Sequence, residues 1–357
     1  LVAGALVDRF DVKWVYALGF LVWSLATMAM GFFSSFATFF ALRLLLGIGE
    51  SVAYPATSRI LAENFPEERR GFANALVDAG SKLGPALSTL VGGLVVAQFG
   101  WRMLFIGAGI ISLFWLIPWL ALVPSQQSNA KGDAVGDKPA AKVTLRELMV
   151  RREVWGTSLG MFCLGYVWIF LISWLPSYLI EERGFSKESM AVLGSLPFWA
   201  MAATSLGGGW LSDRWILSGA SPTRVRKTFL LLGFGLCAVF MFPAAVVKSP
   251  QVSVVFLVAA CAALGIYSSN VWAVTQTLAG SHAAGKWTGL QNAIGNLGGV
   301  VSPVLTGWIV TQTKSFYLAF AAASLVLLAG MVCYIFMVAR IAPLNWLPRA
   351  TPSPSSP

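Results

Sequence analysis

FATFFALRLLLGIGESVAYP, residues 36–55, is long and apolar enough to cross a lipid bilayer, yet it contains an arginine and a glutamate. Arg43 and Glu50 are seven residues apart, so on an α-helix they lie within roughly 20° of each other and about 10 Å apart along the axis. Placing such a charge at the centre of a membrane helix costs roughly 2.5–3.5 kcal/mol. Intramembrane charges therefore usually face a bundle interior or a water-filled path, and this pair indicates that the chain handles an ion or a polar substrate.

Apolar segments of similar length recur along the whole chain. The 357 residues are 57% hydrophobic and only 11% charged, whereas a soluble domain has roughly 25% charged residues. The sequence therefore predicts an all-α integral membrane protein with about ten complete membrane-spanning helices. The ten predicted segments are 15–33, 37–62, 70–98, 103–123, 154–180, 188–212, 227–247, 251–280, 284–312 and 315–339.

Membrane topology explains the net charge of +10 better than nucleic-acid binding does. The basic residues are spread over short loops and form no single face. If loop 7–14 is cytoplasmic, then 124–152, 213–227 and the carboxy-terminal tail share its side and carry most of the Lys and Arg residues. The opposite side has only Arg102, Arg183, Lys187, Lys248 and Lys314. This positive-inside excess predicts the orientation.

An internal repeat divides the chain into two related halves. The pair Asp8-Arg9 follows Gly4-Ala5-Leu6-Val7, and the pair Asp213-Arg214 follows the similar run 208–212. The second half places two helices before its Asp-Arg pair, whereas the first has only the stub 1–6. The chain also begins with Leu, so we expect it to be the amino-terminally truncated part of a twelve-helix protein. The predicted divisions are an amino-terminal bundle (1–123), a cytoplasmic linker (124–152), a carboxy-terminal bundle (153–340) and a cytoplasmic tail (341–357).

Two motifs resemble those of the major facilitator superfamily. The loop Gly4-x-x-x-Asp8-Arg9, with Lys13 following, resembles that superfamily's loop between helices two and three. The run 43–56, RLLLGIGESVAYPA, is similar to the helix-four signature of its anion:cation symporter branch. That branch includes bacterial galactonate, hexuronate, glucarate and tartrate carriers, animal sialin and the vesicular glutamate carriers. The resemblance implies the major facilitator fold, two six-helix bundles, here with the first helix and most of the second missing, and a site near the midplane between them.

The resemblance assigns roles to the helix-four charges. In that branch the helix-four Arg helps to organise the anion site and the helix-four Glu carries the coupled proton, so these roles fall on Arg43 and Glu50. An Arg keeps its charge when buried, whereas a carboxylate can take up a proton. The alternative is a purely structural ion pair that holds the helix in the bundle. Tyr54, in the same signature, joins the expected substrate-binding residues.

Polar residues in two later helices match the sugar-acid carriers of the branch. These carriers have a Ser and a Trp three residues apart on helix ten and an Asn twenty residues further on. Ser269, Trp272 and Asn292 fit that spacing, and Asn296 follows one turn later. Amides and hydroxyls can bind the many hydroxyl groups of a sugar acid without adding charge. Interhelical hydrogen bonding remains the alternative for all of them.

A further charged pair lies in segment 70–98. Asp78 and Lys82 are four residues apart and share one helix face. Either they neutralise each other as an i,i+4 pair, or Lys82 presents its ammonium to a bound anion. Leu164 stands where the vesicular glutamate carriers have an Arg, which argues against a glutamate-like dicarboxylate.

The resemblance implies proton-coupled symport of an organic anion, such as a hexuronate or galactonate, by alternating access in a bacterial cytoplasmic membrane. The protein is expected to act as a monomer, with gating contacts at Asp8, Arg9, Asp213 and Arg214. Alternatives are a drug or metabolite exporter of the same superfamily, a carrier of a non-sugar carboxylate, and a non-transporting sensor. The sequence has no GxSxG, HExxH or P-loop pattern, so no enzyme activity, cofactor or metal is expected.

Overall fold

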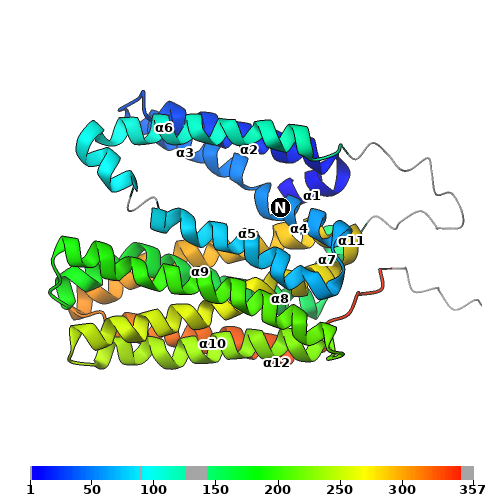
Figure 1. The fold of residues 1–357 in the computed structure, drawn as a ribbon. Helices are drawn as coiled ribbons and strands as arrows, with labels where there is room; N and C mark the ends of the chain where they lie inside the picture. Colours follow the sequence, from blue (N-terminus) through cyan, green and yellow to red (C-terminus); the bar gives the residue numbers. More distant parts are fainter. Residues whose placement is uncertain (1, 88–90, 126–142, 347–357) are drawn as a thin grey trace, which may run out of the picture.

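The computed structural model describes residues 2–87, 91–125 and 143–346, and these residues form a bundle of long helices (Figure 1). All-helical architecture was the prediction, and the structure confirms it. The described helices are α1 (Val2–Arg9), α2 (Val12–Met30), α3 (Phe36–Glu50), α4 (Ala53–Asn64), α5 (Glu67–Leu87), α6 (Gly93–Leu122), α7 (Leu145–Met149), α8 (Arg152–Ser177), the π-helical turn η3 (Tyr178–Glu182), α9 (Lys187–Leu217), α10 (Pro222–Val246), α11 (Pro250–Thr313) and α12 (Tyr317–Met337).

Eight helical segments of the described chain are long and apolar enough to cross a membrane. They coincide with eight of the ten predicted segments, and α11 supplies two of them, Pro250–Gly280 and Ala283–Thr313. α5 and α9 overlap the remaining two predictions, 70–98 and 188–212, but are not among the eight. The structure thus supports eight of the ten predicted membrane spans.

The helices form two groups that meet along a few elements. α2 packs against α3 and α6 in the amino-terminal half, and α8, α10, α11 and α12 pack together in the carboxy-terminal half. The two groups are joined where α5 lies beside α9 and where α1 and α4 lie on α11 (Figure 1). Most of the buried apolar side chains belong to the carboxy-terminal group. A site between the halves must therefore lie near α1, α4, α5, α9 and α11.

The predicted segment 37–62 is divided into two helices. α3 ends at Glu50 and α4 begins at Ala53, with a turn at Ser51 and Val52. Pro55 explains the division, because it has no N–H for the carbonyl of Ser51 and its ring collides with that carbonyl in a regular helix. Arg43 and Glu50 thus share α3, as predicted, while Tyr54 belongs to α4.

Two glycines interrupt the long helices α6 and α11. Gly100 divides α6 with φ 81° and ψ 165°, and Gly280 divides α11 with φ 64° and ψ −178°. Both conformations are open essentially to glycine alone. At Gly280 the chain reverses, so the two spans of α11 pass through the carboxy-terminal half in turn.

The loops at Asp8 and Asp213 are shorter than predicted. α1 continues to Arg9 and α2 starts at Val12, with Asp11 accepting a hydrogen bond from the backbone N–H of Lys13 as N-cap. α9 continues to Leu217, so Asp213 and Arg214 lie in its last turns rather than in a loop 213–227. The physical reason is tertiary, because Asp213 is held against α5. The linker prediction, 124–152, falls mostly on residues 126–142, outside the described residues, and so does the tail beyond 346.

Candidate functional site

A cavity of about 210 Å³ lies between the two halves. α4 and α5 supply its amino-terminal wall, and α8 and both spans of α11 supply the opposite wall. Its lining residues are Tyr54, Asp78, Ser81, Lys82, Met161, Leu164, Gly165, Trp168, Ile169, Ser268, Val271, Trp272, Asn292, Gly295, Asn296 and Gly299. Five of the seven predicted substrate-binding residues, Tyr54, Lys82, Trp272, Asn292 and Asn296, are in this lining.

The charges of the cavity are Asp78 and Lys82 of α5. Both are buried, with side-chain exposures of 4% and 8%, and the Lys82 Nζ lies 3.1 Å from Asp78 Oδ1. The ammonium also lies 4.2 Å from the ring centroid of Trp168 and donates a 3.2 Å hydrogen bond to Ser81. The two alternatives left open by the sequence therefore coexist: Lys82 is paired with Asp78, and its ammonium faces the cavity.

Asp78 also contacts the other half of the molecule. Its Oδ2 accepts hydrogen bonds from the hydroxyls of Ser205 on α9, at 2.9 Å, and Ser268 on α11, at 2.6 Å. One carboxylate thus joins Lys82 to two helices of the carboxy-terminal half. The sequence did not indicate this contact, because Ser205 and Ser268 are far from Asp78 along the chain.

Aromatic and amide side chains complete the lining. The rings of Tyr54 and Trp272 stack across the halves with centroids 4.9 Å apart. Asn296 donates a 3.0 Å hydrogen bond to the carbonyl of Asn292. Among the described residues, the Asn292 side chain has no hydrogen-bond partner, so its amide is available to a ligand.

The serine of α11 that reaches the cavity is Ser268. Ser269, the residue predicted from spacing, is buried and accepts a 3.1 Å hydrogen bond from the side chain of Asn270, and it is not part of the lining. Leu164 does line the cavity, so an apolar side chain occupies the position where the vesicular glutamate carriers have an Arg. Among the described residues that line the cavity, Lys82 carries the only positive charge.

Arg43 and Glu50 lie outside the cavity lining. Arg43 borders a separate, mostly apolar groove of about 1160 Å³ between α1, α2 and α3. Its guanidinium carbon lies 5.7 Å from the ring of Phe39 and 5.8 Å from that of Phe105. No ion pair joins Arg43 to Glu50 in the described part of the chain. The groove includes Ala293, the neighbour of Asn292, so the two hollows approach each other at α11.

The predicted gating aspartates join the halves at one end of the bundle. Asp8 of α1 accepts hydrogen bonds from the backbone N–H groups of Gly285, at 3.0 Å, and Lys286, at 2.8 Å, near the start of the second span of α11. Asp213 of α9 accepts from Gly71, at 3.0 Å, and Phe72, at 2.7 Å, near the start of α5. Each carboxylate lies near a helix amino terminus, where a negative charge is favourable.

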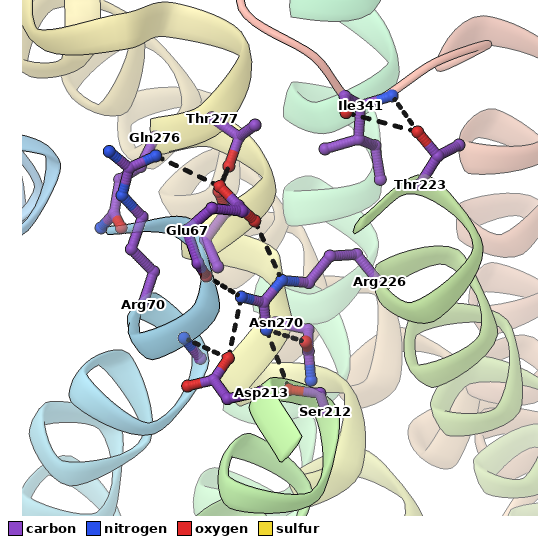
Figure 2. A network of polar contacts seen from close by, with 12 residues as sticks. Glu67, Arg70, Ser212, Asp213, Thr223, Arg226, Asn270, Gln276, Thr277 and Ile341 are labelled. Atoms are coloured by element: carbon purple, nitrogen blue, oxygen red, sulfur yellow. Dashed lines mark hydrogen bonds and ion pairs between the residues drawn. The ribbon is translucent and has the colours of Figure 1, made fainter. Parts of the chain in front are cut away.

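Arg226 reinforces the contact of Asp213 (Figure 2). This α10 side chain is completely buried, and its Nη2 lies 2.9 Å from Asp213 Oδ1. It also donates to Ser212, at 2.8 Å, to Asn270, at 2.9 Å, and to the carbonyl of Glu67, at 2.8 Å. The carboxylate of Glu67 pairs with Arg226 at 3.3 Å, so three helices of one half are tied to the first turn of α5.

The basic neighbours of the two aspartates do not join the halves. Arg9 and Arg214 are exposed, and each guanidinium lies over an aromatic ring of its own segment, Phe10 and Trp210 respectively. Of the four residues predicted to gate, the two aspartates contact the opposite half, and the gating role itself stays a prediction. Sequence reasoning missed Arg226, which it counted only among the basic loop residues.

The sequence as a whole matches one family model. The model described as Major Facilitator Superfamily matches residues 1–303 and 223–357. The chain belongs to the major facilitator superfamily. It is therefore a secondary transporter, a multi-pass membrane protein and not an enzyme.

Curated relatives of the transporter include several carriers of organic anions. It is 30% identical to a probable sulfoacetate transporter of Cupriavidus necator, over 94% of this chain and 81% of the relative. It is 28% identical to a hexuronate transporter of Bacillus subtilis, over 90% and 77%. It is also 28% identical to a probable galactarate/D-glucarate transporter of Escherichia coli, over 95% and 82%. The predicted relationship to sugar-acid and anion carriers is confirmed.

Two solved structures support the fold. A human organic anion transporter superposes with a TM-score of 0.74 at 16% identity, over 93% of this chain and 79% of that one. The fucose:proton symporter of Escherichia coli gives a TM-score of 0.67 at 15% identity, over 94% and 86%. At these identities the likeness shows the major facilitator fold and nothing finer.

Proposed function

We propose that the transporter carries a small organic anion, a sugar acid such as a hexuronate or galactonate, together with protons by alternating access. The observation that carries this proposal is the ammonium of Lys82 in a cavity between the halves. A buried cation in such a place is the expected partner for the carboxylate of a substrate. The names of the relatives agree, because uronates, aldarates and sulfoacetate are all organic anions.

The remaining lining suits a hydroxylated ligand. Tyr54, Ser268, Asn292 and Asn296 offer hydroxyl and amide groups, and the stacked rings of Tyr54 and Trp272 form one wall. A volume of about 210 Å³ is below the roughly 300–1,000 Å³ of pockets for drug-sized ligands. The proposal therefore favours a compact, polar substrate over the large hydrophobic substrate of a drug exporter.

Proton coupling is assigned to Glu50, with Arg43 helping to organise anion entry. Both residues lie on α3, and Arg43 borders the groove that approaches the cavity at Ala293. Movement of α3 relative to α11 would bring this pair closer to the substrate or separate it further. The carrier is proposed to be a monomer, with its 1–123 and 153–340 bundles rocking about the cavity.

The proposed orientation places the Asp8 and Asp213 contacts on the cytoplasmic side of a bacterial inner membrane. It rests on the excess of Lys and Arg in the loops of that side. Since these contacts close that end, the described conformation would be closed toward the cytoplasm. Ser269 does not line the cavity. Its proposed contribution to the substrate site is therefore indirect, through the hydrogen bond that it accepts from Asn270.

Transport in proteoliposomes tests the proposal. Labelled D-galactonate, D-glucuronate and sulfoacetate would be offered with and without an inward proton gradient. We expect gradient-driven accumulation of at least one of them. Glu50→Gln is expected to abolish accumulation while sparing exchange of labelled for unlabelled substrate, and Arg102→Gln, an exposed charge on another helix, serves as control. Gradient-driven efflux instead would indicate an exporter, and unchanged accumulation in Glu50→Gln would exclude Glu50 as the proton carrier.

A further inference from the structure

Asp78 lies where the cavity meets a column of contacts between the halves. We define the closing interface as residues 71–78 of α5 with their partners on α9 and α11. Its outer contact is that of Asp213 with Gly71 and Phe72. Its inner contact is that of Asp78, seven residues further along α5 and so about 10 Å deeper.

The middle of the closing interface is a pair of amides. Asn74 donates to Gln276 of α11 at 2.9 Å, and Gln276 donates back at 3.0 Å. Both side chains are buried. Nearby, the hydroxyl of Thr288 donates to Ser58 at 2.7 Å, which joins α4 to the second span of α11. Neither contact includes a charge, and none of these four residues lines the cavity.

Of the α5 residues in the closing interface, Asp78 lines the cavity, and so does its α11 partner Ser268. One of its oxygens holds Lys82, and the other accepts from Ser205 and Ser268 of the opposite half. The same carboxylate thus neutralises the cation that a substrate needs and holds the halves together.

We propose that Asp78 is an internal competitor of the substrate for Lys82, and that its displacement by the substrate opens the closing interface. The proposal rests on the proposed function, in that the substrate is an anion that pairs with Lys82. Asp78 is then a positioning residue that couples occupancy of the cavity to the arrangement of the halves.

Electrostatics supplies the coupling. Within the described part of the lining, Lys82 is the only cation. A bound carboxylate and Asp78 would therefore share one ammonium at low dielectric, where like charges repel strongly. Relief comes when Asp78 moves away from Lys82, and that movement weakens its hydrogen bonds to Ser205 and Ser268. Linkage makes the effect reciprocal: whatever makes the interface easier to open also makes the anion bind more tightly.

The holding role of Asp78 is tested without any ligand. Ser58→Cys places a thiol, of nearly the same size as the buried hydroxyl, between α4 and α11. Its reaction with a maleimide, corrected for the native cysteines, reports separation of α4 from α11 beside the closing interface. With Ser205→Ala and Ser268→Ala added, we expect reaction roughly three- to ten-fold faster, because two interhelical hydrogen bonds are lost. Ser324→Ala, a buried serine that bonds only within α12, should change nothing.

The competing role is tested by titration with a stated anion mixture. D-glucuronate, D-galactonate and sulfoacetate would be added to purified protein while tryptophan fluorescence is followed, since Trp168 and Trp272 line the cavity. Asp78→Asn keeps an acceptor for the serines but leaves Lys82 without a competing charge. We expect its apparent Kd to fall about ten-fold or more, whereas Lys82→Met should abolish the response.

The outcomes separate the two proposals. A wild-type protein that responds to none of the three anions counts against the proposed substrate class, and leaves the labelling result to judge the holding role. Unchanged labelling in the Ser205→Ala, Ser268→Ala variant overturns the holding role even in a protein that transports. Equal or weaker anion binding by folded Asp78→Asn overturns the competition.

Discussion

Each half of the transporter sends an aspartate to a helix amino terminus of the other half at one end of the bundle. The charges of these two carboxylates are balanced differently. Asp8 reaches from the amino-terminal half to the start of a helix in the other half, and Asp213 makes the reciprocal contact. In each case a glycine, Gly285 or Gly71, receives the carboxylate, and an added Cβ there would collide with it. The repeat thus preserves the geometry of the contact.

The difference lies in the charges around each carboxylate. Asp213 is paired with the fully buried Arg226. Asp8 has no ion pair among the described residues, and the ammonium of Lys286 donates instead to the carbonyl of Val143 at 2.8 Å. Burial therefore raises the pKa of Asp8 to about 6, although hydrogen bonds and nearby positive charges oppose the shift. Burial raises the pKa of Asp213 as well, although the Arg226 guanidinium opposes that shift. Asp8, with no ion pair among the described residues, titrates near neutral pH.

Of the variants that test this difference, removal of Arg226 should destabilise the protein most. Arg226→Met leaves Asp213 and Glu67 without their shared cation in a buried site, and breaking a buried pair in this way costs about 3–5 kcal/mol. We expect a large fall in the thermal unfolding midpoint of the purified protein. Arg224→Met, an exposed arginine one half-turn earlier on α10, should leave the midpoint within about a degree or two. Equal midpoints for both variants would show that the network contributes nothing.

Replacing each aspartate by asparagine should give the next largest effect, and an unequal one. Asp213→Asn removes the partner of a buried guanidinium, so we expect a loss of about 2 kcal/mol. Asp8→Asn keeps an acceptor for only one of the two N–H groups, because Gly285 and Lys286 donate to different carboxylate oxygens. It also removes a charge that burial already disfavours, so its loss should stay near about 1 kcal/mol, the contribution of one hydrogen bond. Thermal unfolding and maleimide reaction at Ser58→Cys would measure both. Equal losses of stability in the two variants would mean that pairing with Arg226 does not make the Asp213 contact stronger than the Asp8 contact.

The helices of this fold are predictable because their signal is local. Each span is set by a run of apolar residues longer than a bilayer is thick, and neither partner nor topology is needed to see it. The ends are not local. In sequence Asp213 resembles the start of a loop, and only the N–H groups of α5 show why α9 continues past it. The division at Ser51 depends on Pro55, whose effect competes with that of the apolar run.

The site could be predicted in part for a similar reason. Asp78 and Lys82 share a face by helical spacing alone, and the structure pairs them at 3.1 Å. Ser268 and Ser269 are both compatible with the face of Trp272, about one turn away. Only Asp78, which comes from the other half, selects Ser268. Arg226 gave no local signal, because all of its partners lie on other helices.

The smallest expected effect is a pH dependence at the weaker contact. Asp8 lies outside the eight candidate spans, and its pKa is about 6 in this conformation against an ordinary value of 3.8. The closed form therefore holds the proton more tightly than a form with Asp8 in water. The stabilisation is complete below about pH 4 and is lost as the pH rises through 6. Between pH 7 and pH 5 the closed form should gain about 1 kcal/mol.

Slower maleimide reaction at Ser58→Cys on acidification, after correction for the reactivity of the thiol with a denatured control, would reveal this gain. Asp8→Asn should abolish the dependence, whereas Asp213→Asn should leave it, because only the Asp8 contact lacks a neutralising ion pair. A pH response that survives in Asp8→Asn would place the titrating group elsewhere. A response lost only in Asp213→Asn would reverse the comparison, and would mean that Arg226 does not hold the charge of Asp213 when the halves are joined.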